Sequence, residues 1–489
     1  MVQMTPARRR FLQGIIHIVL ERSVPCYVAG GYVRDEHVLG RESKDLDLVV
    51  PDGAIRLARE LADATGGAFY ILDRDTDAAR IVYSEPVGWM VDVAAMRAPD
   101  IQGDLRLRDF TINAMAIDIR HLMDGQPSIL DPCNGQADLR QGILRATGPD
   151  AFRQDPVRLL RAVRFAARLG LTIEPDTERW LVRDAGLLTQ PSAERIRQEL
   201  ALIVAADGAA DHLRQLDRLG LVRPILPEVA ALKGVTQSPP HAYDVFEHTV
   251  NSVAQAERLT RLSPVELGQD EAEYLSPFAE ALQVHFGQVL CEERSRATLL
   301  KFAALLHDVG KPLTCQVDDT GRIRALGHEV LGEQMAKDVL TRLRFSSQEI
   351  GIVGTIVRHH MRPGWLLKGP PITRRAVYRF FRDTGDAGID VLILALADQL
   401  AKRGTIPERE HWRDYLRLTH LMLDHYFNMP TEAVCPPRLI SGRDVMTALH
   451  LAPGPDVGRL LEAVREAQAE GVVQTREDAL AFLKRLGGS

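Results

Sequence analysis

Strand-forming runs occur only in the first third of this chain, and this uneven distribution limits the folds that it can adopt. Six short apolar runs of strand length alternate with helical pattern between residues 27 and 119: YVAGG, LDLVV, AFYIL, ARIVY, MVDVA and MAIDI. From about residue 146 such runs are absent, and apolar side chains recur at helical spacing, as they do from Leu159 to Leu169. The sequence therefore predicts an α+β or α/β head followed by helical segments, and the α+β class for the whole chain.

Breaks in composition divide the 489 residues into several parts, as expected for a chain of this length. The polar and proline-rich run TQSPP at 236–240 reads as a linker, and Cys435-Pro436-Pro437 opens a short helical tail. We therefore predict four segments, at residues 1–146, 147–235, 236–430 and 431–489. The third of these is rich in histidine.

Charge and composition restrict the function. The net charge of −6 is not that of a general nucleic-acid binder, so any polyanion must be met by a local basic face. The five cysteines are scattered with no CxxC pair, which argues against both a disulfide framework and a zinc ribbon. No apolar run approaches the roughly 18 to 20 residues of a membrane span, so the sequence predicts a cytoplasmic protein with no membrane partner.

Residues 28–50 carry the strongest chemical signal of the chain. Asp45 and Asp47 begin a strand-like run, and because side chains alternate along a strand, both carboxylates point to the same face and can hold divalent cations such as Mg²⁺ between them. Gly30 and Gly31 allow backbone N–H groups to approach a triphosphate with no Cβ in the way. An isolated acidic pair is usually a solvated turn, but this pair follows GGYVRD at close range.

Three further clusters in the head are ambiguous when each is taken alone. Asp92 stands in the apolar run MVDVA, where it is either a third carboxylate facing the metal or a hydrogen-bonded edge residue. The run RDFTINAMAID places Arg108, Asp109 and Asn113 before an apolar stretch, as an ordinary helix cap also would. Residues 131–145 hold turn formers and the start of a helix.

The order of these motifs resembles that of the class II tRNA nucleotidyltransferase and bacterial poly(A) polymerase family, a branch of the polymerase-β-like superfamily. The resemblance runs through GGYVRD with Asp45 and Asp47, RDFTINAMA, DP-x2-G-x2-DL-x4-LR, QDPVRLLRAVRFAARLG at 154–170 and ERIRQEL at 194–200. Members of this family add nucleotides to RNA 3′ ends without a template. The resemblance therefore implies a polymerase-β-like head, Mg²⁺ as cofactor, CTP and ATP as substrates, and a tRNA 3′ end as the acceptor.

The resemblance also implies roles for individual residues. It makes Asp45 and Asp47 the catalytic Mg²⁺ ligands and places Gly30, Gly31 and Arg34 near the triphosphate. It assigns selection of the ribose to Arg108, Asp109 and Asn113, and reading of the nucleobase edge to Asp155 and Arg158, because a carboxylate and a guanidinium can imitate a template base.

Two features depart from the family pattern. Gln154 replaces the first acid of the EDxxR motif, which removes a charge beside the base-reading residues. Only ten residues, 98–107, stand where full CCA-adding members have a longer flexible loop, and a short loop there is associated with enzymes that add only the two cytidines.

Arginines that recur every three or four residues form one helix face, which either meets RNA or serves solubility: Arg158, Arg161, Arg164 and Arg168.

The histidine-rich segment has chemistry of its own. Its H…HD…D order, with HDVGKP intact, resembles the HD superfamily of metal-dependent phosphohydrolases. Imidazole and carboxylate ligands suit Mn²⁺, Fe, Ni²⁺, Zn²⁺ or Mg²⁺. The resemblance assigns one metal to His248, His307, Asp308 and Asp398, and a second to His328 together with His359 or His360. An HD fold that binds no metal is the alternative.

The sequence therefore predicts an enzyme with two sites: a nucleotidyltransferase that adds C, A or both to tRNA 3′ ends, and a metal-dependent HD hydrolase. Three alternatives stay open. The first is a poly(A)-polymerase-like activity on general RNA. The second is an HD hydrolase whose transferase head only binds nucleotide or RNA, and the third is a non-catalytic RNA-binding protein. The tail is expected to contact substrate or to pack on the HD segment.

Overall fold

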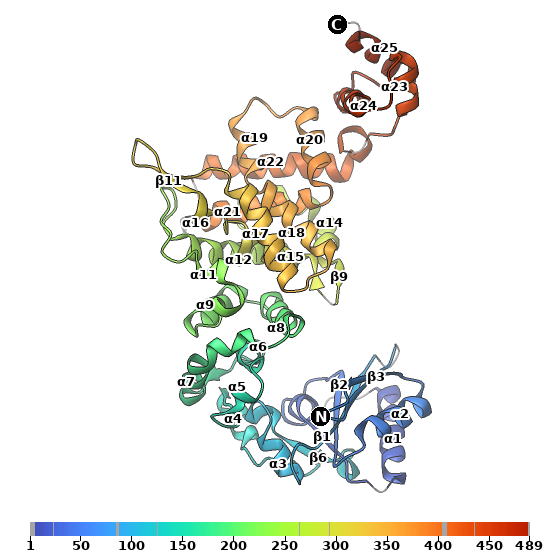
Figure 1. Cartoon of the computed structure of the whole chain (residues 1–489), viewed down its shortest axis with the longest axis vertical. Coiled ribbons are helices and arrows are strands. Elements are labelled where there is room, and N and C mark those ends of the chain that lie inside the picture. Colours follow the sequence, from blue (N-terminus) through green and yellow to red (C-terminus); the bar gives the residue numbers. More distant parts are fainter. Residues whose placement is uncertain are drawn as a thin grey trace. The chain divides into compact units, whose positions relative to one another are not determined.

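The computed structural model describes residues 5–22, 24–84, 88–124, 126–263, 265–292, 294–402, 408–434 and 436–487 (Figure 1). Cys435, with which the predicted tail opens, lies outside these ranges. The chain forms two compact units, residues 1–191 and residues 192–489. Their boundary falls inside the segment predicted at 147–235, and the four predicted segments stay a prediction.

A six-stranded sheet is the centre of the first unit. Its spatial order is β3-β4-β5-β2-β1-β6, in which β2 and β5 run parallel and the other neighbours run antiparallel. All six strand-like runs of the sequence become these strands, which confirms the predicted head: β1 (Tyr27–Ala29), β2 (Asp45–Val50), β3 (Ala68–Asp73), β4 (Ala78–Val82), β5 (Met90–Ala95) and β6 (Ala116–Asp118).

Alternation along β2 separates a core face from a polar face. Leu46, Leu48 and Val50 are buried in one apolar core with α1 (Pro6–Glu21) and α2 (Ala54–Thr65). The residues between them therefore point to the opposite face of the sheet, which places both acids of the strand there. On that face Val49 packs in a second core with Leu105 of α3 (Ile101–Arg106).

Short helices and turns complete the first unit. They are η1 (Val33–Val38), η2 (Thr111–Asn113), η3 (Ile119–His121), α4 (Gly135–Gln141), α5 (Ala151–Gln154), α6 (Arg158–Leu169), α7 (Pro175–Asp184) and η4 (Ala185–Thr189). Helix α6 confirms the helical spacing read from Leu159 to Leu169, and it ends at Gly170, which adopts φ +66°.

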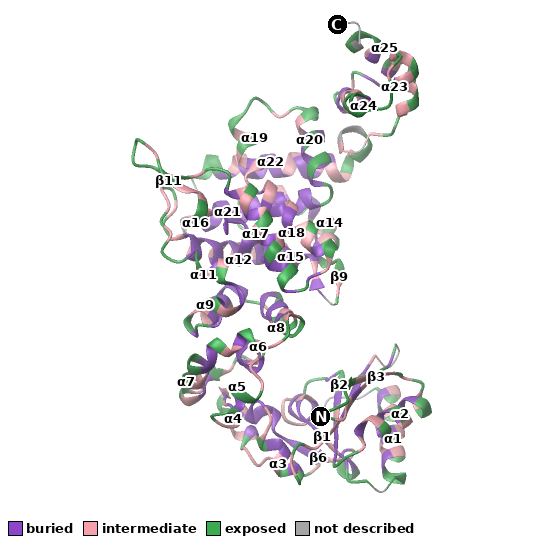
Figure 2. Ribbon diagram, viewed as in Figure 1, coloured by how far each residue is buried: buried purple, intermediate pink, exposed green. Residues whose placement is uncertain are grey.

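The second unit is a helical bundle. Helix α21 (Ala387–Ala401) is buried along its whole length and packs against α12 (Val245–Arg261), with α15 (Arg296–Leu306) and α18 (Ser347–His359) around them (Figure 2). The other helices of the bundle are α8 (Ala193–Ala205), α9 (Ala209–Arg218), α10 (Val222–Ile225), α11 (Pro227–Ala230), α13 (Gln269–Leu275), η5 (Ser276–Phe278), α14 (Ala279–Gly287), α16 (Lys311–Thr314), α17 (His328–Arg342), α19 (Arg362–Lys368), α20 (Arg374–Thr384), α22 (Arg409–Asn428) and η6 (Pro430–Val434).

Three helices form the tail, and they have an apolar core of their own: α23 (Gly442–Leu449), α24 (Pro455–Ala469) and α25 (Arg476–Gly487). Helix α24 packs on α20, where the buried carboxylate of Glu466 pairs with Arg375 at 2.5 Å and with Arg379 at 2.6 Å. Of the two expectations for the tail, packing on the HD segment is the one seen in the structure.

The expectation that strands end at residue 146 is wrong in detail. Short strands follow in pairs: β8 (Thr172–Ile173) pairs with β7 (Ile143–Leu144), β9 (Val289–Cys291) with β10 (Arg294–Ser295), and β11 (Cys315–Val317) with β12 (Ile323–Ala325). Three of these strands, β7, β8 and β10, have only two residues, which is too short to show a period of two in the sequence. Among the described helices, none combines the length and the apolar character that a membrane crossing needs.

Candidate active sites

The acids of the head meet at the junction of β2 and β5. Asp47 pairs in register with Asp92 across the two parallel strands, and Asp45 begins the same edge of β2 two residues earlier. Arg80 on β4 holds Asp92 through two hydrogen bonds, with Nε 2.7 Å from Oδ1 and Nη2 2.8 Å from Oδ2. Both oxygens of Asp92 are thus engaged by Arg80, and its role as a third metal-facing carboxylate stays a prediction.

Gly30 leaves a space that a side chain would fill. It follows β1 with φ +73°, and a Cβ built on it would lie 2.7 Å from Oδ2 of Asp47 and 3.0 Å from Nη1 of Arg108. A carboxylate and a guanidinium therefore converge on a bare backbone position. Gly31 is less confined, since its Cβ would come no closer than 3.7 Å to Nη2 of Arg34.

We expect Gly30→Ala to reduce nucleotide addition by about 100-fold, because the added methyl group would displace Asp47 or Arg108 and a positive φ strains alanine. Gly142→Ala is the matched control, since Gly142 has φ +69° and a Cβ there would meet nothing within 4 Å. The measurement is the initial rate of extension of a tRNA transcript by each variant. Equal rates for the two variants would show that nucleotide addition does not need the open space at Gly30.

A buried chain of polar contacts connects three of the family motifs. Arg34 pairs with Asp35 through two bonds of 2.7 Å, and its Nη1 also donates to Oδ1 of Asn113. The amide of Asn113 donates to Asp109 at 3.0 Å, and the other oxygen of Asp109 lies 2.8 Å from Nη2 of Arg161 on α6. Burial raises the pKa of Asp109, but Arg161 and Asn113 outweigh burial, so the net pKa is lowered and the carboxylate stays charged.

Arg158, which the resemblance assigns to base reading, lies at the start of α6 and is buried. Its guanidinium donates to the backbone carbonyls of Leu107 at 3.0 Å and Ala151 at 3.1 Å, and Gln154 Oε1 lies 3.4 Å away. Burial lowers the pKa of Arg158, partly offset by Asp109 and Asp155. Asp155 accepts a bond of 3.3 Å from the backbone of Val157 just before α6.

The arginine face of α6 is not uniform. The guanidinium carbons of Arg161, Arg164 and Arg34 lie 5.5, 4.4 and 5.3 Å from the ring centre of Phe165. Arg168 is more open, with 60% of its side chain exposed and its Nη2 3.9 Å from Asp35. The predicted stripe thus runs from the buried Arg158 through the half-buried Arg161 and Arg164 to the exposed Arg168, and contact with RNA stays a prediction.

The carboxyl group of Asp47 has a raised pKa. Burial raises its pKa to about 6, with Asp92 and Asp45 adding to the rise and Arg108 opposing it. The native protein thus binds this proton more tightly than the unfolded chain does, and the ionised carboxylate costs stability above about pH 6. That cost falls as the pH is lowered from about 6 and is absent below the ordinary pKa of 3.8.

We therefore expect Asp47→Asn to raise the melting temperature of the metal-free protein by about 2 °C or more at pH 8, and the gain to vanish near pH 4. The measurement is a thermal melt in EDTA at several pH values. Asp52→Asn, at an exposed position just after β2, is the control and should leave the melting temperature unchanged at pH 8 and at pH 4. A rise in melting temperature that is the same at every pH would show that the charge of Asp47 does not cause it.

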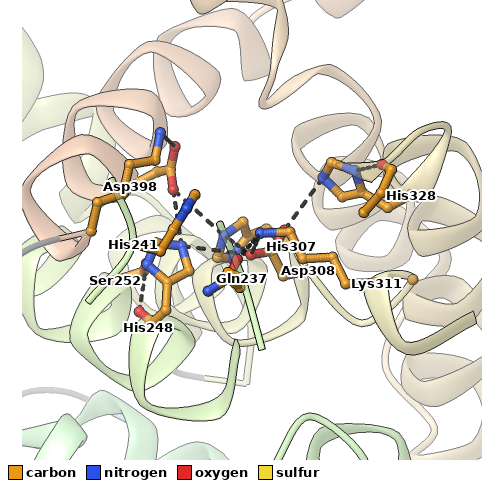
Figure 3. A network of polar contacts seen from close by, with 12 residues as sticks. Gln237, His241, His248, Ser252, His307, Asp308, Lys311, His328 and Asp398 are labelled. Carbon is orange, nitrogen blue, oxygen red and sulfur yellow. Dashed lines mark hydrogen bonds and ion pairs between the residues drawn. The ribbon is translucent and has the colours of Figure 1, made fainter. Parts of the chain in front are cut away.

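The histidines and acids of the predicted HD site lie on helices of the bundle or directly after them, and they come together (Figure 3). His248 lies in the first turns of α12, which Asp244 caps by accepting the N–H of Glu247 at 2.9 Å. His307 and Asp308 directly follow α15, His328 is the first residue of α17, His360 directly follows α18, and Asp398 lies on α21. The ends of these helices, where chain direction changes, therefore supply most of the cluster.

Two groups in this cluster have the geometry of metal sites. The ligand atoms of His248, His307 and Asp308 lie within 4.8 Å of one another, and so do those of Asp308, His328 and His360. Asp398 joins the first group, with Oδ1 3.0 Å from Nε2 of His248. Asp308 is shared: its Oδ2 lies 3.2 Å from Nε2 of His307 and its Oδ1 3.3 Å from Nε2 of His328.

The donor atoms fit a metal ion. Nε2 of His248, Nε2 of His307 and Oδ2 of Asp308 converge and are buried, and none of them has a hydrogen bond of standard geometry to a described residue. The Nδ1 atoms of three histidines face backbone carbonyls, at 2.8 Å for His307, 2.6 Å for His328 and 2.7 Å for His360. Such bonds fix the proton on Nδ1 and leave Nε2 free to bind a metal.

Of the two candidates at 359 and 360, the structure brings His360 into the cluster. His359 is only partly buried and belongs to neither group. Burial and the neighbouring Arg362 lower the pKa of His359, whereas burial and the adjacent His307 and His328 lower that of His360 to about 3. His360 is thus held as a neutral imidazole, the form that binds metals.

Two lysines that the sequence reasoning missed pair with the acids of the cluster. Lys311 Nζ lies 2.6 Å from Oδ2 of Asp308, and Lys402 Nζ lies 2.9 Å from Oδ2 of Asp398. Although burial raises the pKa of both acids, these ammonium groups and the nearby histidines hold it well below 3.8. Lys402 follows Asp398 by one helical turn, which is a signal that the sequence offered.

Profiles of known families cover three stretches of the chain in order. The profile described as "Poly A polymerase head domain" matches residues 26–145, "Probable RNA and SrmB- binding site of polymerase A" matches 170–233, and "HD domain" matches 245–403. An A-adding tRNA nucleotidyltransferase of Deinococcus radiodurans is 35% identical over 464 residues, or 94% of each chain. The chain belongs to the tRNA nucleotidyltransferase family.

Other tRNA nucleotidyltransferases agree over the same length. A CC-adding enzyme of Thermus thermophilus is 34% identical over 94% of this chain and 92% of its own. The structure titled as a complex of CCA-adding enzyme with CTP has a TM-score of 0.63 at 21% identity, over 99% of this chain and 97% of that one. The Thermotoga maritima CCA-adding enzyme complexed with tRNA has a TM-score of 0.60 at 20% identity, over 99% and 96%. The matched profiles confirm the predicted polymerase head and HD domain of the chain, and the similar structures share its fold.

Proposed function

We propose that the chain extends the 3′ end of tRNA with C, A or both, using CTP and ATP. The observation that carries the proposal is the convergence of Asp47 and Arg108 on Gly30, beside Asp45 on the same strand. Relatives that match over nearly the whole chain bear the names of A-adding and CC-adding tRNA nucleotidyltransferases, and similar structures contain CTP, ATP or tRNA.

The polar face of the sheet supplies what nucleotidyl transfer needs from the protein. Asp45 and Asp47 would hold Mg²⁺, which when bound activates the attacking 3′-hydroxyl and neutralises the leaving pyrophosphate. Arg108 presents a guanidinium beside the same space and would donate to phosphate oxygens. Arg34 is fixed by Asp35 and Asn113, so it would hold the backbone of Gly30 and Gly31 in place for the triphosphate.

Base and sugar recognition would lie between η2 and α6. We propose that Asp109 and Asn113 bind the ribose and that Asp155 and Arg158 present an edge to the nucleobase. The contact of Arg158 with Gln154 at 3.4 Å is the feature through which the missing charge of the EDxxR motif would act. The exposed Arg168 and its neighbours Arg161 and Arg164 would meet phosphates of the RNA.

The segment 98–107 favours addition of cytidines alone. It folds as the compact helix α3, which Asp100 caps by accepting the N–H of Gly103 at 2.7 Å. Buried Asp104 accepts from the backbone N–H and from Nε of Arg97, both at 3.1 Å, so the helix is tied down next to the site. A segment built this way supplies no long loop for a change from CTP to ATP, and we therefore infer CC-adding specificity. The name of the Deinococcus radiodurans relative favours A addition as the second candidate.

The specificity is tested by extending a tRNA transcript that lacks its 3′ CCA, with CTP alone, ATP alone or both, and sizing the product at single-nucleotide resolution. We expect the product to stop after two cytidines with both nucleotides present. Three additions would show a complete CCA-adding enzyme. A single A added only to tRNA ending in CC would show an A-adding enzyme, and long A tails would show a poly(A) polymerase.

The buried histidine groups support a second activity at the HD site. We propose that His248, His307, Asp308 and Asp398 hold one divalent metal and that His328 and His360, with Asp308, hold another. A metal bound there would supply an activated water for attack on a phosphate ester. The carboxylates, kept ionised by Lys311 and Lys402, and the neutral imidazole of His360 are in the protonation states that metal binding needs.

A further inference from the structure

The imidazoles of the HD site continue beyond the two metal groups. Four of them follow one another with ring centres 5.5 Å apart from His248 to His307, 5.1 Å from His307 to His360 and 5.2 Å from His360 to His328. His241 extends this row, with its ring centre 5.2 Å from that of His248 (Figure 3). The other four rings are buried, and His241 alone in the row is partly exposed, so it lies at the end nearer to solvent.

His241 belongs to a short segment, residues 237–242, that we call the strap. Although its sequence reads as a free linker, the strap is fixed to two parts of the bundle. Oγ of Ser238 accepts the N–H of Ile323 on β12 at 2.7 Å, and the N–H of Ala242 donates to the carbonyl of Lys402 at 2.8 Å. The strap therefore has a defined place beside the cluster.

The strap presents a buried amide nitrogen that the described residues do not satisfy. Oε1 of Gln237 accepts from Nζ of Lys311 at 2.6 Å, which leaves its amide Nε2 as a donor. That Nε2 is buried and has no hydrogen-bond partner among the described residues. Nδ1 of His241 lies 3.1 Å from the carbonyl of Ser238, which leaves Nε2 of this ring for a bound group.

Two ammonium groups that can donate hydrogen bonds to an anion lie near the strap. Lys311 contacts both Gln237 and Asp308, and Lys402 contacts Asp398, so an ammonium group stands at each acid of the cluster. A buried amide donor without a partner destabilises the protein until a ligand supplies an acceptor. A phosphoryl oxygen is an acceptor of this kind.

We propose that the strap is the phosphate-binding element of the HD site, in which Nε2 of Gln237 donates to a phosphoryl oxygen and His241 contacts the same phosphoryl group. The ligand class is a phosphate ester. This inference rests on the proposed metal-dependent hydrolase function of the HD site. It adds two residues that lie outside the metal groups. Gln237 contributes an amide donor that has no partner among the described residues, and His241 contributes an imidazole at the partly exposed end of the row.

The test uses the full chain with Asp45→Ala and Asp47→Ala, so that the head contributes no acidic metal site. Calorimetry first gives the affinity for Ni²⁺, and then the affinity of the Ni²⁺-loaded chain for inorganic phosphate. We expect His241→Asn and Gln237→Ala each to weaken phosphate binding about tenfold and to leave the Ni²⁺ affinity within about twofold. His359→Asn, a partly buried histidine outside both groups, is the matched control and should change neither affinity.

Phosphate binding by the strap and metal binding by the HD site are tested separately by these measurements. Unchanged phosphate affinity in both strap variants, with Ni²⁺ still bound, would overturn the inference and leave the metal site standing. Loss of Ni²⁺ affinity in His241→Asn would make His241 a metal ligand and overturn its assignment to phosphate. Failure of the parent chain to bind Ni²⁺ would overturn the metal site itself, and the inference with it.

Discussion

Replacing Asp45 and Asp47 together by alanine is expected to lower nucleotide addition at least 1,000-fold while hydrolysis at the HD site persists. The two carboxylates share one face of β2, and Asp92, which lies opposite Asp47 on β5, is held by Arg80 through both oxygens. Loss of the groups that hold the catalytic cations removes most of the charge stabilisation of phosphoryl transfer.

The measurement is single-turnover extension of a tRNA transcript with CTP and ATP in Mg²⁺, together with hydrolysis of a phosphodiester by the same preparation. Persistent hydrolysis would show that the second unit of the variant is folded, and a thermal melt like that of the Asp52→Ala protein would show that the head is folded as well. Asp52→Ala, which removes an exposed acid just beyond β2, serves as the control. Extension within tenfold of the parent rate would refute the assignment of the transferase site, and loss of both activities would point to a folding defect instead.

Asp308→Asn is expected to remove both metals of the HD site and to abolish hydrolysis. Asp308 alone belongs to both metal groups, with one oxygen 3.2 Å from His307 and the other 3.3 Å from His328. An amide keeps the volume and accepts from Lys311, but it lacks the charge that draws a divalent cation. We expect the affinity for Ni²⁺ or Mn²⁺ to fall at least 100-fold.

Metal content after dialysis and hydrolysis of a phosphodiester measure this effect, and tRNA extension together with the helical circular dichroism of the same variant reports that both units are folded. His359→Ala supplies the comparison, because it removes a histidine one residue away from the cluster. Should Asp308→Asn keep two tightly bound metals, the shared carboxylate would not be a ligand, and the HD cluster would need another explanation.

Local patterns in the sequence predicted most of the fold. The six strand runs, the helix from 158 to 169 and the facing acids of β2 all depend on periods of two or 3.6 residues, which a single sequence displays. The register that sets Asp47 opposite Asp92 depends on which strands are neighbours, and the pairing of Arg80 with Asp92 depends on that order too. The sequence therefore left the role of Asp92 open.

The HD cluster shows the same division. Its histidines were visible as motifs, but the choice between His359 and His360 depends on where α18 ends, since only the residue after the helix turns into the cluster. His241 and Gln237 lie in a segment with no periodicity, and their place beside the site is set by bonds to distant parts of the chain. Such contacts leave no trace in local sequence pattern.

Each candidate site takes all of its residues from one compact unit, the transferase acids from 1–191 and the HD cluster from 192–489. Natural selection can therefore act on the two chemistries separately, because a substitution in one site leaves the residues of the other in place. Descendants of such a chain could lose hydrolysis and keep tRNA extension, or narrow the choice of nucleotide without touching the hydrolase. Presence of one activity in a homologue is thus poor evidence for the other.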